Sequence, residues 1–365
     1  MTRSSARRLA AALALSAAAV TLTACGSGGD SDGSDGSGSS GGDQVTLVTH
    51  DSFNVSPEVL EKFTEQTGYR VQVLRAGDAG VMVNQAVLSK NNPQGDVLFG
   101  IDNTLLSRAL DEGVFTPYEA VGLDTVPETY QLDAGEHRVT PVDSGDICVN
   151  YDRAYFAEHD LAPPQDLDDL IDPAYRDLLV VQNAATSSPG LGFLLGTVAA
   201  YGDDGWQEYW QALRDNGVEV VDGWEQAYNE RFSGAGGGAG DRPLVVSYAS
   251  SPPAEVIYGE GELPEEGPTG VSSGTCFRQI EFAGLLAGAG NPEGGQALLD
   301  FLIGLDFQED LPLQMFVNPV RPDAELPQEF VTYGETIETP LTMEPQRIAE
   351  HREDWVSTWT SLVIR

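Results

Sequence analysis

From residue 44 onward, short apolar runs alternate with segments of helical character, and this alternation constrains the fold more than any other feature. The runs at 45–49, 70–74 and 96–100 have the length and composition of strands. Between the first two, Ser56-Pro57 provides an N-cap and a first-turn proline, and Gly68 ends the helix. Further strands are expected at 178–182 and 244–248, and further helices at 79–90, 190–201, 204–215, 292–305 and 344–362. The pattern predicts an α/β protein.

Polar segments directly follow four of these strands, at 49–52, 101–103, 183–190 and 247–251. In open α/β sheets, ligands bind beyond the carboxyl ends of the strands. The four segments are therefore expected to line one shared cleft.

The first 43 residues have a different character. Three arginines precede an apolar run at 9–20, which is too short to span a bilayer of ~30 Å and predicts a signal peptide covering 1–24. Small residues before Cys25 resemble the bacterial lipobox, which predicts lipidation of Cys25. Residues 26–43 contain only Gly, Ser and Asp. Residues 25–43 are therefore expected to be a lipidated flexible tether.

The charge balance excludes several functions. With 19 basic and 57 acidic residues, the formal charge is −38, which argues against nucleic-acid binding and against electrostatic docking on anionic lipid. The lysines, Lys62 and Lys90, do not follow a glycine, so the chain has no P-loop.

The cysteines and histidines are the candidates for covalent or metal sites. An exported chain meets oxidising conditions, so Cys148 and Cys276 are expected to form a disulfide. The four histidines are scattered without ligand spacing, and neither a metal site nor a cofactor is expected.

One catalytic motif is present, because 270–274 fits G-x-S-x-G around Ser272. A nucleophile elbow needs a strand before it, and 264–269 does not have strand character. No histidine falls in a motif that would supply a base. A secreted lipoprotein hydrolase using Asp51 or Ser272 is the alternative from another functional class.

Aromatic, hydroxyl and acidic residues indicate a pocket for a flat cation. Trp224 and Tyr248 offer ring faces, which attract cations. The run 186–192 places hydroxyls and glycines at a helix start, where free N–H groups can receive an oxyanion. Asp51 and Asp102 supply negative charge.

Several of these segments together resemble the substrate-binding protein family of the bacterial thiamine ABC transporter. The matching pieces are Thr49-His50-Asp51-Ser52-Phe53, the run 96–103, Thr186-Ser187-Ser188-Pro189-Gly190-Leu191-Gly192, Gly223-Trp224-Glu225-Gln226-Ala227-Tyr228 and Ser247-Tyr248-Ala249-Ser250-Ser251-Pro252. The resemblance implies a type II periplasmic-binding fold. Lobe 1 would comprise 44–143 plus 275–365, lobe 2 would comprise 144–274, and two crossings near 141–146 and 270–276 would act as the hinge.

The resemblance also implies roles for individual residues. Ser187, Ser188 and Gly190 would face the hydroxyethyl or phosphate end of thiamine, and Trp224 and Tyr248 would pack on its rings. Asp51 and Asp102 would lie near the cationic or aminopyrimidine parts. The predicted ligand-binding set is completed by Ser52, Asn103, Ser250 and Phe316.

The chain departs from the family pattern at two places. Pro253-Ala254-Glu255 stands where a family tyrosine can occur, and Phe316 stands where a tryptophan is expected. Phe316, or Tyr258 one turn beyond Ala254, is the candidate replacement for the lost stacking.

The expected function is capture of thiamine or a thiamine phosphate for an ABC permease, by a monomer held to the outer face of the cell membrane through its lipid. Within the same fold, polyamine and iron(III) binding are the alternatives. Iron-binding relatives usually present two adjacent tyrosines, whereas 247–249 offers one.

Overall fold

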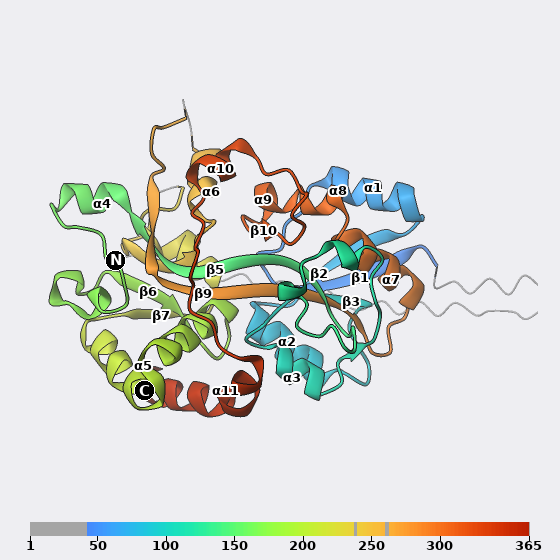
Figure 1. Cartoon of the computed structure of the whole chain (residues 1–365), viewed down its shortest axis with the longest axis horizontal. Coiled ribbons are helices and arrows are strands. Elements are labelled where there is room, and N and C mark those ends of the chain that lie inside the picture. The colour runs from blue at the N-terminus through green and yellow to red at the C-terminus, as the bar shows by residue number, and fades with distance from the viewer. Residues whose placement is uncertain (1–41, 237–238, 260–262, 365) are drawn as a thin grey trace, which may run out of the picture. The chain divides into compact units, whose positions relative to one another are not determined.

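The computed structural model describes residues 42–236, 239–259 and 263–364 (Figure 1). The predicted signal peptide, the lipidation site Cys25 and most of the tether lie outside the described residues, so those predictions are not tested by the fold.

The described chain forms a mixed α/β structure around one ten-stranded sheet. The main path of the sheet runs in the order β2 (Arg70–Arg75), β1 (Gln44–Thr49), β3 (Val97–Asp102), β9 (Thr269–Leu286), β5 (Thr140–Asp152), β8 (Leu244–Tyr248), β6 (Leu179–Gln182) and β7 (Glu219–Val221). Two short strands join it, β4 (Phe115–Thr116) beside β9 and β10 (Asn318–Pro319) beside β5. The strands are parallel at each end of the sheet and antiparallel at its centre. Parallel neighbours need crossover connections, which are usually helical.

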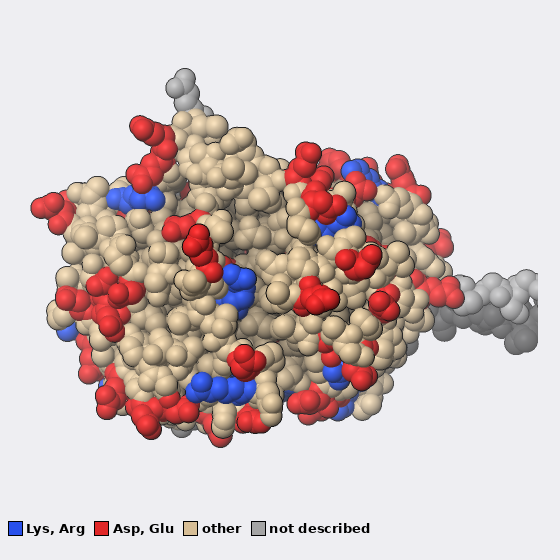
Figure 2. Space-filling model, viewed as in Figure 1, with Lys and Arg blue, Asp and Glu red and all other residues tan. Residues whose placement is uncertain are grey.

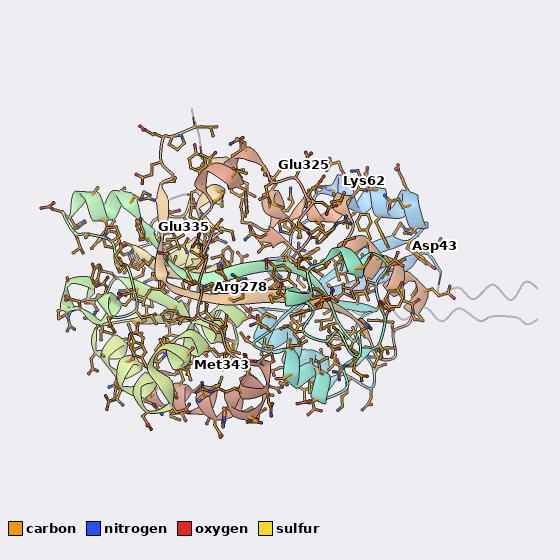
Figure 3. All side chains as sticks on the ribbon, viewed as in Figure 1. Asp43, Lys62, Arg278, Glu325, Glu335 and Met343 are labelled. Carbon is orange, nitrogen blue, oxygen red and sulfur yellow. A yellow bond between two sulfur atoms is a disulfide. The ribbon has the colours of Figure 1, made fainter. Side chains whose placement is uncertain are left out.

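The centre of the sheet consists of the two longest strands, β5 and β9, which run from one end to the other (Figure 1). The sequence predicted only crossing segments near 141–146 and 270–276. A disulfide joins Cys148 to Cys276. Close to it Arg278, which is labelled in Figure 3, donates from its guanidinium to Asp146 on β5, with Nε 2.6 Å from Oδ1. These cross-links hold the two strands together where they connect the ends of the sheet.

Most of the predicted helices are present. The structure has α1 (Pro57–Thr67), α2 (Ala79–Leu88), α3 (Leu106–Asp111), α4 (Arg153–Glu158), α5 (Ser188–Asp215), α6 (Pro252–Ile257), α7 (Pro292–Leu302), α8 (Leu305–Gln308), α9 (Leu311–Gln314), α10 (Gln328–Tyr333) and α11 (Pro345–Trp359). Gly68 ends α1 with φ of 80°. The helices predicted at 190–201 and 204–215 are the two parts of α5, which is interrupted at Gly202 with φ of 70°. Among the described residues, no helix is both long and apolar enough to cross a membrane.

Shorter helical turns fill several connections. They are the 3₁₀ turns Leu123–Thr125, Glu128–Tyr130, Asp169–Ile171 and Pro173–Tyr175, and the π-helical segments Gln226–Arg231 and Thr360–Ile364.

Two apolar cores cover the two faces of the sheet at its β1–β3 end. Leu47 of β1 packs with Phe63 of α1 and Leu298 of α7 in one core, while Val48 packs with Met82 of α2 in the other. Adjacent residues enter opposite cores because strand side chains alternate between faces. The second core continues along α5 to α11 (Figure 1).

The C-terminal helix docks on α5. Trp359 contacts Trp210 edge to face, with ring centroids 5.4 Å apart, and Arg214 donates to the carbonyl of Leu362. The predicted lobe boundaries assign 275–365 to lobe 1, although α5 belongs to the predicted lobe 2. The division into lobes stays a prediction. These contacts associate the C-terminal helix with α5 and therefore with the predicted lobe 2.

The surface in Figure 2 carries many more acidic than basic side chains. This distribution follows from the sequence charge of −38.

Candidate functional site

A cavity of about 340 Å³ lies where several loops and strand ends meet. The contributing segments are the end of β1, the start of α2, the start of α5, the chain after β7, the end of β8, helix α6, strand β9 and the 314–317 loop. Its lining residues are His50, Ser52, Asp78, Ala79, Ser188, Pro189, Trp224, Glu225, Tyr228, Asn229, Gly236, Tyr248, Ala254, Glu255, Tyr258, Glu281, Gln314, Met315, Phe316 and Val317.

One side of the cavity is the aromatic wall, which we define as Trp224, Tyr228 and Tyr248. The Trp224 indole stacks on Tyr228 with centroids 4.9 Å apart and planes 13° apart, and its Nε1 donates to the Ser247 hydroxyl at 3.0 Å. Because Tyr228 covers one face of the indole, a ligand ring can stack only on the other face. The indole is thus fixed before any ligand arrives.

A second aromatic pair borders the cavity. Tyr258 and Phe316 meet edge to face with centroids 5.5 Å apart. Phe316 has φ of 55°, a conformation that is unfavourable for a bulky side chain and that clusters at functional sites. Both of the residues predicted as candidate replacements for lost stacking therefore lie at the cavity.

The cavity also has an acidic floor, which we define as the lining residues Asp78 and Glu281 together with the buried Asp102 and Asp143. Glu281 on β9 is paired in register with Asp102 on β3 and with Asp143 on β5, so three carboxyl groups form a row across the sheet. The side chains are nearly inaccessible, with exposures of 0% for Asp102, 5% for Glu281 and 1% for Asp143.

Burial of this row shifts its ionisation. Burial raises the pKa of Asp102 to about 6, despite the hydrogen bonds from Thr104 and Gln279. Burial and the neighbouring Glu281 raise the pKa of Asp143 well above its usual range. Gln279 donates to Asp102 Oδ2 at 3.0 Å and to Ser188 Oγ and Glu281 Oε1 at 3.4 Å, which connects the row to the cavity.

Asp78 links the acidic floor to the aromatic wall. Its Oδ2 accepts the backbone N–H of Trp224 at 3.0 Å, and next to it the N–H of Val81 donates to the carbonyl of Thr186. Burial raises the pKa of Asp78, while the Trp224 N–H and the nearby His50 act in the opposite direction.

His50 is the one basic side chain among the lining residues of the described chain. Its Nε2 lies 3.7 Å from Glu281 Oε2. Burial lowers the pKa of His50, but Glu281 first, then Asp78 and Asp51, raise it, and the net shift is upward from 6.5.

The structure brings together five of the predicted ligand-binding residues. Ser52, Ser188, Trp224, Tyr248 and Phe316 line the cavity. Asp51 instead accepts the N–H of Gly77 at 3.0 Å and does not line it. Asp102 lies beneath Gln279, and the Asn103 amide holds the backbone of β9 by bonding to Ile280 and Arg278.

The remaining predicted residues also lie outside the lining. Ser187 is the buried N-cap residue of α5. A side chain at Gly190 would place its Cβ 2.5 Å from the Gln182 carbonyl oxygen, so glycine there serves the packing of α5 on β6. Ser250 borders a separate cavity of about 370 Å³ beside Arg278.

Three lining residues, His50, Asp78 and Glu281, are not in the predicted ligand-binding set. His50 lies within one of the segments that resemble the family, and Asp78 occupies the N-cap position of α2. Glu281 interrupts the apolar run of β9, and a lone acid in a strand buried on both faces was the available signal.

Ser272 does not have the surroundings of a nucleophile. It lies in strand β9, is buried, and donates to the carbonyl of Pro164 at 2.7 Å. This explains why the G-x-S-x-G match at 270–274 is not a nucleophile elbow.

Comparisons with known proteins agree with a binding site of this kind. The family of bacterial extracellular solute-binding proteins matches residues 92–335. The thiamine-binding periplasmic protein of Escherichia coli is 29% identical over 327 residues, covering 88% of this chain and 94% of that protein, and that of Haemophilus influenzae is 25% identical over 331 residues, covering 88% and 92%. These relatives are not enzymes, which agrees with the prediction of a binding module rather than a hydrolase.

The solved structures show the same fold. A periplasmic thiamin binding protein superposes with a TM-score of 0.75 at 27% identity, covering 88% of this chain and 96% of that one. A ferric binding protein from Campylobacter jejuni superposes with a TM-score of 0.67 at 15% identity, covering 87% and 99%. The predicted type II periplasmic-binding fold is thereby confirmed.

Proposed function

The chain belongs to the bacterial extracellular solute-binding proteins, and from this premise we propose that it captures thiamine or a thiamine phosphate outside the cytoplasm and passes it to an ABC permease. The relatives named for thiamine binding align with nearly the whole described chain.

The observation that carries the proposal is one cavity that is lined both by a fixed indole and by buried acidic side chains. Its volume of about 340 Å³ falls in the range of small-molecule sites, roughly 300–1,000 Å³. A planar ring cation is stabilised by both kinds of group, because ring faces attract cations and carboxylates neutralise their charge. Thiamine has such a ring.

The proposed placement of the ligand follows from the charges. The cationic ring would stack on the free face of Trp224 and lie within reach of Asp78 and Glu281. The hydroxyethyl or phosphate end would point to Ser188 at the start of α5, where helix N–H groups favour oxyanions.

Calorimetry tests the proposal with four kinds of probe: thiamine, its mono- and diphosphates, spermidine and ferric citrate. We expect saturable heat with at least one thiamine form. The absence of heat with every thiamine form would reject the proposal.

Polyamine binding is the second candidate, and the acidic lining favours it. Asp78, Glu225, Glu255 and Glu281 all line the cavity, and several carboxylates suit a multiply charged, flexible cation. Tight binding of spermidine without binding of thiamine would select this function over the first.

Tryptophan fluorescence provides an independent test. Stacking of the ligand on Trp224 should quench part of the emission of the five tryptophans. A Trp224→Phe variant retains a ring but should lose that quenching. Equal quenching in the variant would remove Trp224 from the contact.

We further propose that the protein is exported and anchored through a lipid on Cys25, and that it is a monomer whose two lobes close about β5 and β9. A Cys25→Ser variant should leave the membrane fraction, and the mass of the wild-type protein should include the lipid. Retention of the variant in the membrane would argue against the anchor.

A further inference from the structure

We propose that the imidazolium of His50 takes the place of the ligand's positive charge in the unliganded protein, so that binding of a ring cation expels a proton. This inference rests on the proposed function, because it concerns a cationic ligand at the same cavity. It adds a residue and a linked proton that neither the thiamine assignment nor the family membership supplies.

The geometry places His50 where the charge of a ligand would be neutralised. Its Nε2 lies 3.7 Å from Glu281 Oε2, and both side chains line the cavity. Within the described structure, Nε2 has no hydrogen-bond partner although it is buried. A donor group of a ligand can therefore compete for Glu281 without first breaking a close hydrogen bond.

The imidazole is held in this position by packing. A Cβ on Gly100 would overlap the His50 ring, and glycine there, with φ of 98°, leaves the space that the ring occupies. The ring also contacts Phe99, with centroids 5.9 Å apart. Since these contacts restrict the ring, the simplest response to a nearby cation is loss of its proton.

The groups that face His50 all favour its protonated form. Glu281 comes from β9, Asp78 from the loop before α2 and Asp51 from its own segment, and β3 contributes the uncharged Phe99 and Gly100. Their combined effect exceeds the opposing effect of burial and raises the pKa of His50 above 6.5. A ligand cation close to Glu281 neutralises this field and repels the imidazolium, because like charges interact strongly where water is excluded.

The direction of the pH dependence follows. The raised pKa of unliganded His50 falls when the cation binds, so the complex holds fewer protons than the unliganded protein. Affinity therefore increases as pH rises through the window between the liganded and unliganded pKa values, by up to tenfold for each pH unit.

The experiment measures thiamine affinity and proton release in wild type and His50→Gln. Calorimetry at about pH 6 and about pH 8, in buffers that differ in heat of ionisation, gives both quantities. We expect wild-type affinity to increase roughly three- to tenfold over this interval, with net proton release, and the variant to lose most of both effects. His351→Gln, an exposed histidine on α11, is the matched control and should behave as wild type.

The outcomes separate the possibilities. Thiamine binding with the same affinity at both pH values and no proton release in wild type would overturn the inference while leaving the proposed function intact. Equal proton release in wild type and His50→Gln would assign the proton to Asp78 or another carboxyl group and also overturn it. If His50→Gln does not fold, proton release by wild type together with loss of the His50 imidazolium signal in NMR on thiamine addition still decides the question. No binding of any thiamine form would reject the proposed function itself.

Discussion

The aromatic wall and the acidic floor border the same cavity but differ in how the chain builds them. Trp224 and Tyr228 are four residues apart on one segment, and their stacking is a local contact. Glu281, Asp102 and Asp143 are far apart in sequence and meet only because β3, β9 and β5 are neighbours in register. A site can thus combine one part that is fixed by a short motif with another that depends on the whole sheet.

The two regions also differ in energetic cost. The aromatic wall buries apolar area and satisfies its indole N–H, so it stabilises the fold as well as the ligand. The acidic floor buries carboxyl groups beside one another, which costs stability and raises the pKa of Asp143 and Asp102. Substitutions in the acidic floor should have the largest effect on ligand binding.

Glu281→Gln should weaken thiamine binding by about 2–4 kcal/mol, because it removes the charge that faces His50 and the ligand while keeping the shape of the side chain. Calorimetry with thiamine measures the change. Glu335→Gln is the control, since Glu335 does not line the cavity. Equal losses in the two variants would mean that general surface charge, not the acidic floor, determines affinity.

Trp224→Ala should weaken binding by roughly 1–3 kcal/mol, the scale of one buried aromatic contact. The backbone N–H of residue 224 can still donate to Asp78, so the loss reports on the ring. Trp224→Phe should recover part of the affinity. If the alanine variant binds as tightly as wild type, stacking on the aromatic wall is not part of recognition.

The aromatic wall could be predicted from the sequence better than the acidic floor, because its stacking is a local contact whereas the acidic residues meet only through strand pairing. The run 223–228 carries its own signal, because the spacing of Trp224 and Tyr228 is helical and follows a turn. The acidic positions carry no local signal of their roles. Asp51 follows β1 and accepts the Gly77 N–H of a neighbouring loop, whereas Asp102 is the last residue of β3 and is covered by Gln279.

The same contrast holds for the fold. Strands β1, β2, β3, β6 and β8 were predictable because each is a short apolar run followed by a turn or helix signal. Residues 140–147 contain proline, aspartates, serine and glycine, which resemble a loop, yet they belong to β5 because β9 pairs along one side of this stretch and β10 and the end of β8 pair on the other. Only tertiary pairing makes that segment a strand.

Asp143→Asn should increase the free energy of unfolding by about 1–2 kcal/mol at about pH 7.5, because an amide cannot ionise and the substitution removes the cost of a buried acid beside Glu281. The folded-state pKa values of Asp143 and Asp102 are raised, so their stability contribution is greatest below the unfolded value of 3.8 and is lost as pH rises, for Asp102 through about 6. Wild type should therefore be more stable at about pH 5 than at about pH 7.5, and the variant should show a smaller difference. Urea denaturation at the two pH values measures both, and a variant less stable than wild type at the higher pH would contradict the cost assigned to the acidic floor.

Asp51→Asn should change thiamine affinity by less than ~0.5 kcal/mol, because Asp51 is exposed and accepts the Gly77 N–H outside the cavity lining. The asparagine oxygen can still accept that N–H, so the loop before α2 keeps its conformation. Asp78→Asn, one residue beyond that loop glycine, should weaken binding more, since Asp78 lines the cavity. Each variant removes one negative charge near the start of α2. A difference in affinity between the two variants therefore reports on the position of the carboxyl group and not on the net charge. A larger loss for Asp51→Asn would restore the assignment made from the strand-end rule and would mean that the loop turns toward the ligand when it binds.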